Sequence, residues 1–170
     1  MDVTSFTSHS HYIFGIGNPF ASDDKIGLYI IDELLKTNEY SNCYTKKVES
    51  DLFEIIDELN KIPDSKTIML VDAILTDKYS PGSVIVFDFN DKQSPEIKFA
   101  SVSHSLSIID IIKMNKAITK RNLSIIVLGV VIKNTDYGEI ISKNILTKKG
   151  LILNLISKFC NDIEITGIYT

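Results

Sequence analysis

The chain has 170 residues, of which 44% are hydrophobic and 24% are charged, and its formal net charge is −4. This apolar share excludes a disordered chain and suffices for one core, while no apolar run is long enough to span a membrane. The basic stripe of a nucleic-acid-binding protein is also missing, because adjacent basic residues occur only as the pairs Lys46–Lys47, Lys120–Arg121 and Lys148–Lys149.

The length predicts a single domain over residues 11–170, preceded by a loose polar lead-in at 1–10. The lead-in has neither the basic nor the apolar part of a signal peptide. Cys43 and Cys160 are far apart and form no ligand-spaced pair, so no disulfide framework is indicated. We therefore expect a cytoplasmic protein that acts as a monomer.

The first part of the chain predicts strands alternating with helices. An apolar run at 11–16 predicts a strand, and helical spacing of Ile and Leu follows over 26–35, with Ser22 or Asp23 as the N-cap. A second strand is predicted at 42–48. Next come a short helix over 51–60, capped by Ser50 or Asp51, and a strongly apolar strand over 67–71 that ends at Asp72.

The second part continues the pattern after a turn at Pro81-Gly82. Strands are predicted at 83–89, 95–100 and 123–132, the last being rich in β-branched residues, as a buried central strand is. A helix that carries Leu106, Ile109, Ile112 and Met114 begins at Ser105 or Ser107, and another covers 149–159.

This alternation predicts an α/β fold: one three-layer domain with a twisted, mostly parallel sheet and helices on both faces. Ligands of such sheets lie outside the carboxyl ends of the strands. Three predicted loops at that edge carry polar residues, namely Asn18, Asp23 and Asp24, then Asp72, then His104. Two carboxylates and an imidazole suit a divalent metal such as zinc or nickel, and equally suit acid–base chemistry.

Each of these residues also has a purely structural interpretation. Asp23 and Asp24 could only cap a helix, Asp72 could cap the loop after its strand, and His104 could be an ordinary satisfied or exposed histidine. Asp136 and Glu139 fall on the same edge and are interpreted as loop and cap residues. Gly15-Ile16-Gly17 begins like a dinucleotide-binding fingerprint, but Phe20 replaces its third glycine.

Several segments, taken in order, resemble the hydrogenase maturation endopeptidases. Gly15-Ile16-Gly17-Asn18 with Asp23-Asp24 and Gly27 is similar to the first motif of that family. The later segments are Val71-Asp72-Ala73 with Pro81-Gly82, His104-Ser105-Leu106-Ser107, and Gly129-Val130. The chain departs from the family pattern at Lys25, where many members have glycine, and at Glu49-Ser50-Asp51-Leu52-Phe53, where many have a glycine-rich segment.

The resemblance implies an endopeptidase that removes the C-terminal extension of a nickel–iron hydrogenase large-subunit precursor after nickel insertion. It implies that Asp24, Asp72 and His104 are the metal-contacting and catalytic residues, with Asn18 and Asp23 in support. The nickel would come with the substrate protein. Two other functions stay open: a non-catalytic binding module for a nucleotide or a metal-loaded partner, and a free-standing metallohydrolase.

Overall fold

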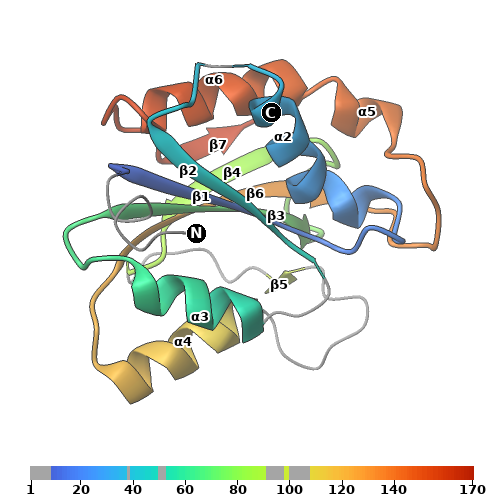
Figure 1. The fold of residues 1–170 in the computed structure, drawn as a ribbon. Helices are drawn as coiled ribbons and strands as arrows, with labels where there is room; N and C mark the ends of the chain where they lie inside the picture. The colour runs from blue at the N-terminus through green and yellow to red at the C-terminus, as the bar shows by residue number, and fades with distance from the viewer. Residues whose placement is uncertain (1–8, 38, 50–52, 91–97, 100–107) are drawn as a thin grey trace.

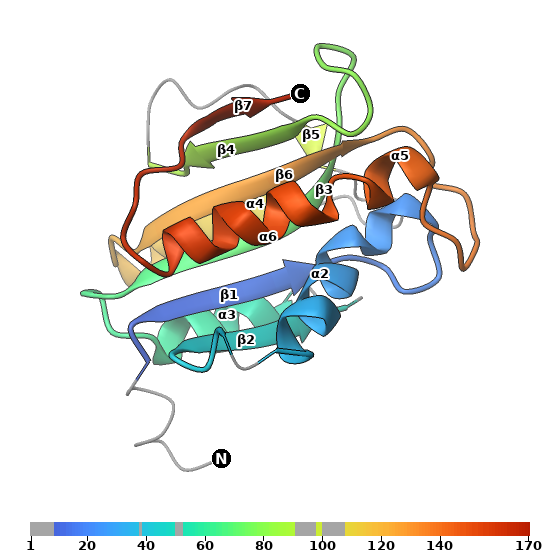
Figure 2. The ribbon, with the colours of Figure 1, turned by 90° about the horizontal axis from the view of Figure 1, so that it is seen from above.

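The protein is a sheet between two layers of helices, seen in the computed structural model (Figures 1 and 2). The structure describes residues 9–37, 39–49, 53–90, 98–99 and 108–170. The strands are β1 (His11–Ile16), β2 (Cys43–Val48), β3 (Thr67–Leu75), β4 (Val84–Asp88), β5 (Lys98–Phe99), β6 (Ser124–Ile132) and β7 (Gly167–Tyr169). The helices are η1 (Asp23–Lys25), α2 (Ile26–Leu35), α3 (Phe53–Lys61), α4 (Ile108–Thr119), α5 (Lys143–Leu146) and α6 (Lys149–Phe159).

The sheet runs in the order β2-β1-β3-β6-β4-β7, and β5 pairs with β3 outside this path. Strands β2, β1, β3 and β6 are parallel, while β4, β5 and β7 are antiparallel to their partners. The carboxyl ends of the four parallel strands therefore meet at one edge of the sheet. The predicted α/β class, with a mostly parallel sheet, is confirmed.

Two apolar cores, one on each face of the sheet, hold the layers together. Ile30 and Ile31 of α2 and Ile152 and Leu155 of α6 pack in the first core. Helices α3 and α4 cover the other face, where Ile55, Leu59, Ile111 and Ile112 are buried. Helices cover β1, β3 and β6 on both faces of the sheet, which explains why these strands are mostly apolar. The strand at 123–132, predicted to be central and buried, is β6.

The amino end of α2 packs directly on the backbone of two strands, which only a glycine permits. A Cβ built at Gly27 would lie 2.3 Å from the carbonyl oxygen of Ile16 and 2.4 Å from that of Val71. A Cβ at Gly17 would lie 2.3 Å from the carbonyl oxygen of Asp24. These glycines of the first motif bring η1 against the ends of β1 and β3, and so position the acidic pair.

Two neighbouring lysines of β2 serve opposite faces of the sheet. Lys46 Nζ lies 2.7 Å from a carboxylate oxygen of Glu54 and 3.0 Å from one of Glu58, both on α3. Lys47 Nζ lies 2.9 Å from Asp32 on α2. Successive side chains of a strand point to opposite faces of the sheet, so β2 forms ion pairs with a helix on each face.

Several sequence predictions need correction. The third strand does not end at Asp72 but continues to Leu75, because the apolar residues after Asp72 stay buried and pair with β6. Ser22 precedes η1 without a side-chain capping hydrogen bond, and the N-cap of α2 is Lys25. The short strand β7 was not predicted. The predicted caps Ser50 and Asp51, and the predicted helix start at Ser105 or Ser107, lie outside the described residues.

None of the helices in the described part of the chain is long and apolar enough to cross a membrane.

Candidate functional site

The loop between β1 and η1 fixes the orientation of Asp24. The backbone N–H of Asn18 donates to Asp24 Oδ2 at 3.0 Å. The side chain of Asn18 shapes the same loop, because its Oδ1 accepts the N–H of Phe20 at 2.9 Å. Asn18 therefore acts on Asp24 through the backbone rather than through a direct side-chain contact.

The second oxygen of Asp24 has no partner. Among the described residues, Asp24 Oδ1 is the buried side-chain polar atom that lacks a hydrogen bond. Burial raises the pKa of Asp24 from its ordinary 3.8 to about 6, against the opposing effect of the Asn18 N–H. A buried carboxylate oxygen without a donor is costly, and a bound cation or a proton would remove that cost.

Asp72 lies within β3, opposite Gly129 of β6, and is buried. Its Oδ1 accepts the N–H of Ala73 at 2.8 Å. Burial raises its pKa well above the ordinary value, and the negative charge of Asp24 raises it further. Asp72 is therefore not the loop cap that one interpretation of the sequence allowed.

The structure brings Asp24 and Asp72 together at the carboxyl edge of the parallel strands. One oxygen of each carboxylate is held by a backbone N–H. Oxygen ligands of this kind suit a divalent metal, and the unpartnered Asp24 Oδ1 fits such a role. The third predicted ligand, His104, lies outside the described residues. Within the part of the chain that the structure describes, no group of three or more metal-ligating side chains gathers.

Asp23 faces away from this pair and anchors a distant segment. Its Oδ1 accepts the N–H of Ser142 at 2.6 Å, and its Oδ2 accepts the Ser142 hydroxyl at 2.9 Å. The backbone N–H groups of Ser22 and Asp23 donate to the carbonyls of Asp136 and Asn134. The segment that follows β6 is thus bound along the loop that carries Asp24.

Lys25 closes the same loop. Its Nζ donates to the carbonyl of Pro19 at 3.1 Å and to that of Gly138 at 2.9 Å. The lysine that replaces the family's common glycine therefore joins the loop after β1 to the segment after β6.

Ser142 and the joining role of Lys25 were not predicted. Ser142 lies 119 positions from Asp23, and nothing in its local sequence marks it as a partner. Asp136 contributes a backbone carbonyl and Glu139 is a loop residue, in agreement with their structural interpretation.

No family model matches the chain. A Methanocaldococcus jannaschii protein assigned as a hydrogenase maturation protease is 28% identical over 151 residues, which cover 85% of each chain.

Solved structures of hydrogenase maturation proteases are similar to this chain in fold. The [NiFe] hydrogenase maturation protease HybD of Thermococcus kodakarensis matches with a TM-score of 0.70 and 26% identity, covering 88% of this chain and 98% of that one. The endopeptidase HybD of Escherichia coli matches with a TM-score of 0.62 and 17% identity, covering 92% and 96%, and supports the fold alone. The predicted resemblance, to a family of peptide hydrolases, is confirmed.

Proposed function

We propose that the protein is a hydrogenase maturation endopeptidase that removes the C-terminal extension of a nickel-loaded large-subunit precursor. The observation that carries the proposal is the buried pair Asp24 and Asp72 at the carboxyl edge, with Asp24 Oδ1 unpartnered. The likeness to maturation proteases in sequence and fold supports it.

In this proposal the nickel belongs to the substrate, and Asp24, Asp72 and His104 contact it. The two backbone N–H groups hold the carboxylates in place before the substrate arrives. A substrate-borne cation would neutralise two carboxylates that repel each other in the free protein, so a precursor with nickel binds better than one without it. This preference makes metal insertion a condition for cleavage.

The bound nickel would hold the precursor so that the scissile peptide lies at the same edge, and could polarise its carbonyl. Asn18 and Asp23 act as positioning residues, the first through the loop that holds Asp24 and the second through Ser142. Closing the loop with Lys25 limits how far Asp24 can move.

The test is incubation of the protein with a hydrogenase large-subunit precursor, with and without nickel, followed by mass spectrometry. We expect a mass loss confined to the C-terminus of the nickel-loaded precursor. The variants Asp72→Asn and His104→Ala should lose cleavage while keeping the fold, measured by circular dichroism. Normal cleavage by both variants would refute the assignment of these residues.

Two other outcomes correspond to the other functions that the sequence leaves open. A stable complex without cleavage indicates a binding module for a metal-loaded partner. Tight binding of zinc or nickel by the isolated protein, measured by titration calorimetry, indicates a free-standing metallohydrolase.

A further inference from the structure

A groove of about 450 Å³ opens over α2 and the end of β2. Pro19 and Lys25 line one end of it, and they belong to the loop and helix that carry Asn18 and Asp24. Its walls come from α2, the end of β2 and the segment that precedes α5. The volume lies within the range of sites that bind ligands.

The groove is lined by apolar side chains and by charged side chains in which acids outnumber lysines. Leu28, Tyr29 and Leu146 contribute apolar surface. Lys47 pairs with Asp32, and Lys25 is occupied by two backbone carbonyls. Among the charged residues of the groove, Glu49 and Glu139 have no ion pair within the described part of the chain. Lys25 keeps its positive charge, so the charged residues that line the groove carry a net charge of −1.

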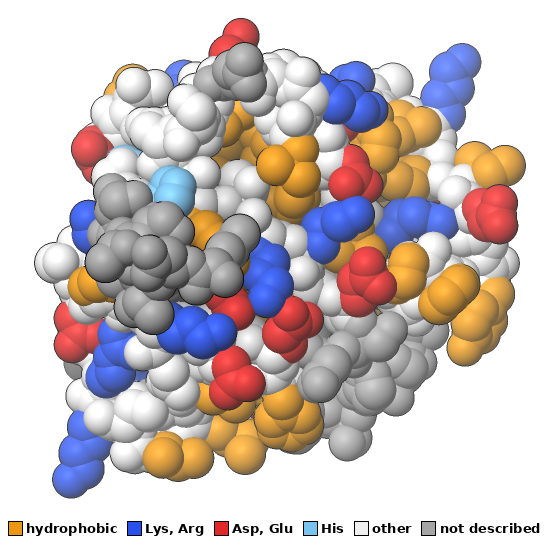
Figure 3. All heavy atoms as spheres, in the orientation of Figure 1, with side chains coloured by type: hydrophobic (Ala, Val, Ile, Leu, Met, Phe, Trp, Pro, Cys, Tyr) orange, Lys and Arg blue, Asp and Glu red, His pale blue; other side chains and the backbone are white. Residues whose placement is uncertain are grey.

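Large hydrophobic side chains stand exposed next to the groove. Phe20, Tyr137 and Ile140 are 68%, 83% and 81% exposed. The backbone of Phe20 accepts the N–H of Gly138, so these side chains belong to neighbouring segments. Figure 3 shows hydrophobic side chains gathered at the right of the molecule, with charged side chains among them. Clusters of this kind mark protein-binding surfaces.

We propose that this groove holds the peptide segment that flanks the scissile bond of the precursor. Apolar side chains of that peptide would pack on α2, and a basic side chain of the peptide would face Glu49 and Glu139. The inference rests on the proposed function. Pro19 and Lys25 connect the groove to the loop that carries Asp24, so the chain that flanks the cleaved bond can reach it, and the net negative charge of the groove favours a basic side chain there.

The test compares cleavage kinetics and precursor affinity of the variants Ile140→Asp and Glu139→Lys. Ile118→Asp is the matched control, because Ile118 is 78% exposed on α4. We expect both groove variants to raise KM by about tenfold with kcat changed by less than about twofold. The control should behave as the wild type. A neutral replacement of the basic residue in the precursor should weaken wild-type binding similarly.

Equal KM and equal affinity for the groove variants and the control would overturn the inference. If the wild type fails to cleave, the proposed function is wrong. The affinity of the precursor for the wild type and for Ile140→Asp, measured by calorimetry, still decides whether the groove binds it.

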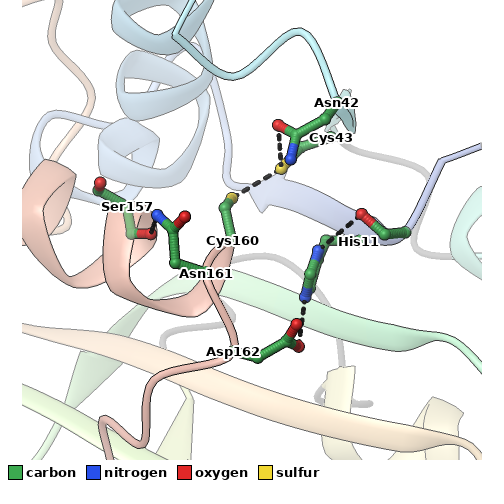
Figure 4. A network of polar contacts seen from close by, with 8 residues as sticks. His11, Asn42, Cys43, Ser157, Cys160, Asn161 and Asp162 are labelled. Carbon is green, nitrogen blue, oxygen red and sulfur yellow. Dashed lines mark hydrogen bonds and ion pairs between the residues drawn. The ribbon is translucent and has the colours of Figure 1, made fainter.

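A second observation, independent of the function, concerns the two cysteines. Cys43 begins β2 and Cys160 is the C-cap of α6, and both are buried free thiols. Their sulfurs lie 2.7 Å apart although the residues are 117 positions apart (Figure 4). The Cys43 thiol donates to the Cys160 sulfur, and this sulfur–sulfur hydrogen bond lowers the pKa of Cys43, while burial opposes the shift.

The backbone around Cys160 is held in place by its neighbours. Asp162 Oδ1 lies 3.0 Å from His11 Nε2, and the side chain of Asn161 donates to the carbonyl of Ser157 at 2.7 Å (Figure 4). Both thiols are therefore held facing each other before any reaction.

We infer that Cys43 and Cys160 are a reversible dithiol that a peroxide converts to a disulfide. The Cys43 thiolate attacks hydrogen peroxide, giving a sulfenic acid and, after protonation of the leaving hydroxide, water. The Cys160 sulfur then attacks the sulfenic sulfur, forms the S–S bond and releases a second water. Two thiols are oxidised and one peroxide is reduced to two waters.

Peroxide treatment of the intact protein, followed by mass spectrometry, tests this inference. We expect a loss of two hydrogen atoms, a rise in Tm of about 5–10 °C, and reversal of both by dithiothreitol. Cys43→Ser and Cys160→Ser should each abolish the shift. Addition of oxygen atoms, disulfide-linked dimers, or two alkylatable thiols after treatment would each overturn it.

Discussion

The charge of Asp24 raises the pKa of Asp72, although the first residue belongs to η1 and the second to β3. Two buried carboxylates that oppose each other destabilise the folded chain at neutral pH. We therefore expect Asp24→Asn and Asp72→Asn each to raise the free energy of unfolding at pH 8, by about 1–3 kcal/mol. Urea unfolding measures the gain, and both variants should lose precursor cleavage.

A matched control for these variants is Asp136→Asn, an exposed carboxylate on the neighbouring segment. Its stability should equal that of the wild type. If Asp24→Asn and Asp72→Asn were no more stable than this control, the two carboxylates would not be in electrostatic conflict.

The pH dependence of stability follows from the same pair. The folded pKa of Asp24, about 6, is higher than the ordinary 3.8, so the folded protein binds more protons between these values. Its contribution is fully present below about pH 4 and is lost as the pH rises through about 6. The pKa of Asp72 is also raised well above its ordinary value, so its contribution has the same sign. Relative to Asp24→Asn/Asp72→Asn, the wild type should lose stability from pH 4 to pH 8, as urea titrations at each pH would measure. A constant difference between the two proteins would contradict this prediction.

The close packing of α2 on the sheet makes Gly27 intolerant of a side chain. Gly27→Ala places a Cβ against the carbonyls of Ile16 and Val71, so α2 must move and the free energy of unfolding should fall by about 3 kcal/mol. Gly150→Ala in α6 is the control, because its Cβ would meet no atom within 4 Å. It should be neutral or stabilising, since alanine favours a helix. Equal stability of the two variants, measured by thermal unfolding, would exclude the close approach.

The anchor between Asp23 and Ser142 should be needed for both stability and cleavage. Asp23→Ala leaves the N–H and the hydroxyl of Ser142 without their acceptor, which should cost about 1–3 kcal/mol. It should also lower kcat, because the loop that holds Asp24 loses one support. Asp136→Ala, which removes a carboxylate from the same region but keeps its backbone carbonyl, should change neither. A wild-type kcat for Asp23→Ala would remove Asp23 from the positioning residues.

Much of the fold was predictable because buried parallel strands have a distinctive sequence. Strand β1 and helix α6 were predicted with the bounds that the structure has, and helix α2 with its observed end but an earlier start, because η1 precedes it. The end of β3 was mispredicted because Asp72 interrupts an apolar run whose burial continues. Strand β7 is three residues long and pairs with β4, a tertiary relationship without a local pattern.

The sequence could predict which residues of the candidate site lie at the carboxyl edge, because the order of strands and loops determines that position. The carboxyl-edge rule selected Asn18, Asp23, Asp24, Asp72 and His104; the structure brings Asp24 and Asp72 together, and His104 lies outside the described residues. It could not distinguish the roles of Asp23 and Asp24, which are neighbours in sequence but bind different segments. The contacts of Lys25 and Ser142, and the pairing of Cys43 with Cys160, join residues over 100 positions apart and follow from no local spacing.

The two lysines of β2 have a consequence for self-association. Strand β2 is an outer strand of the sheet, so within the described part of the chain no other strand pairs with one side of its backbone. A second copy that paired there with β2 in register would bring its own Lys46 and Lys47 beside the first pair. Like charges directly opposite on paired strands repel. A pairing register that sets these lysines opposite their own copies is therefore disfavoured at this edge.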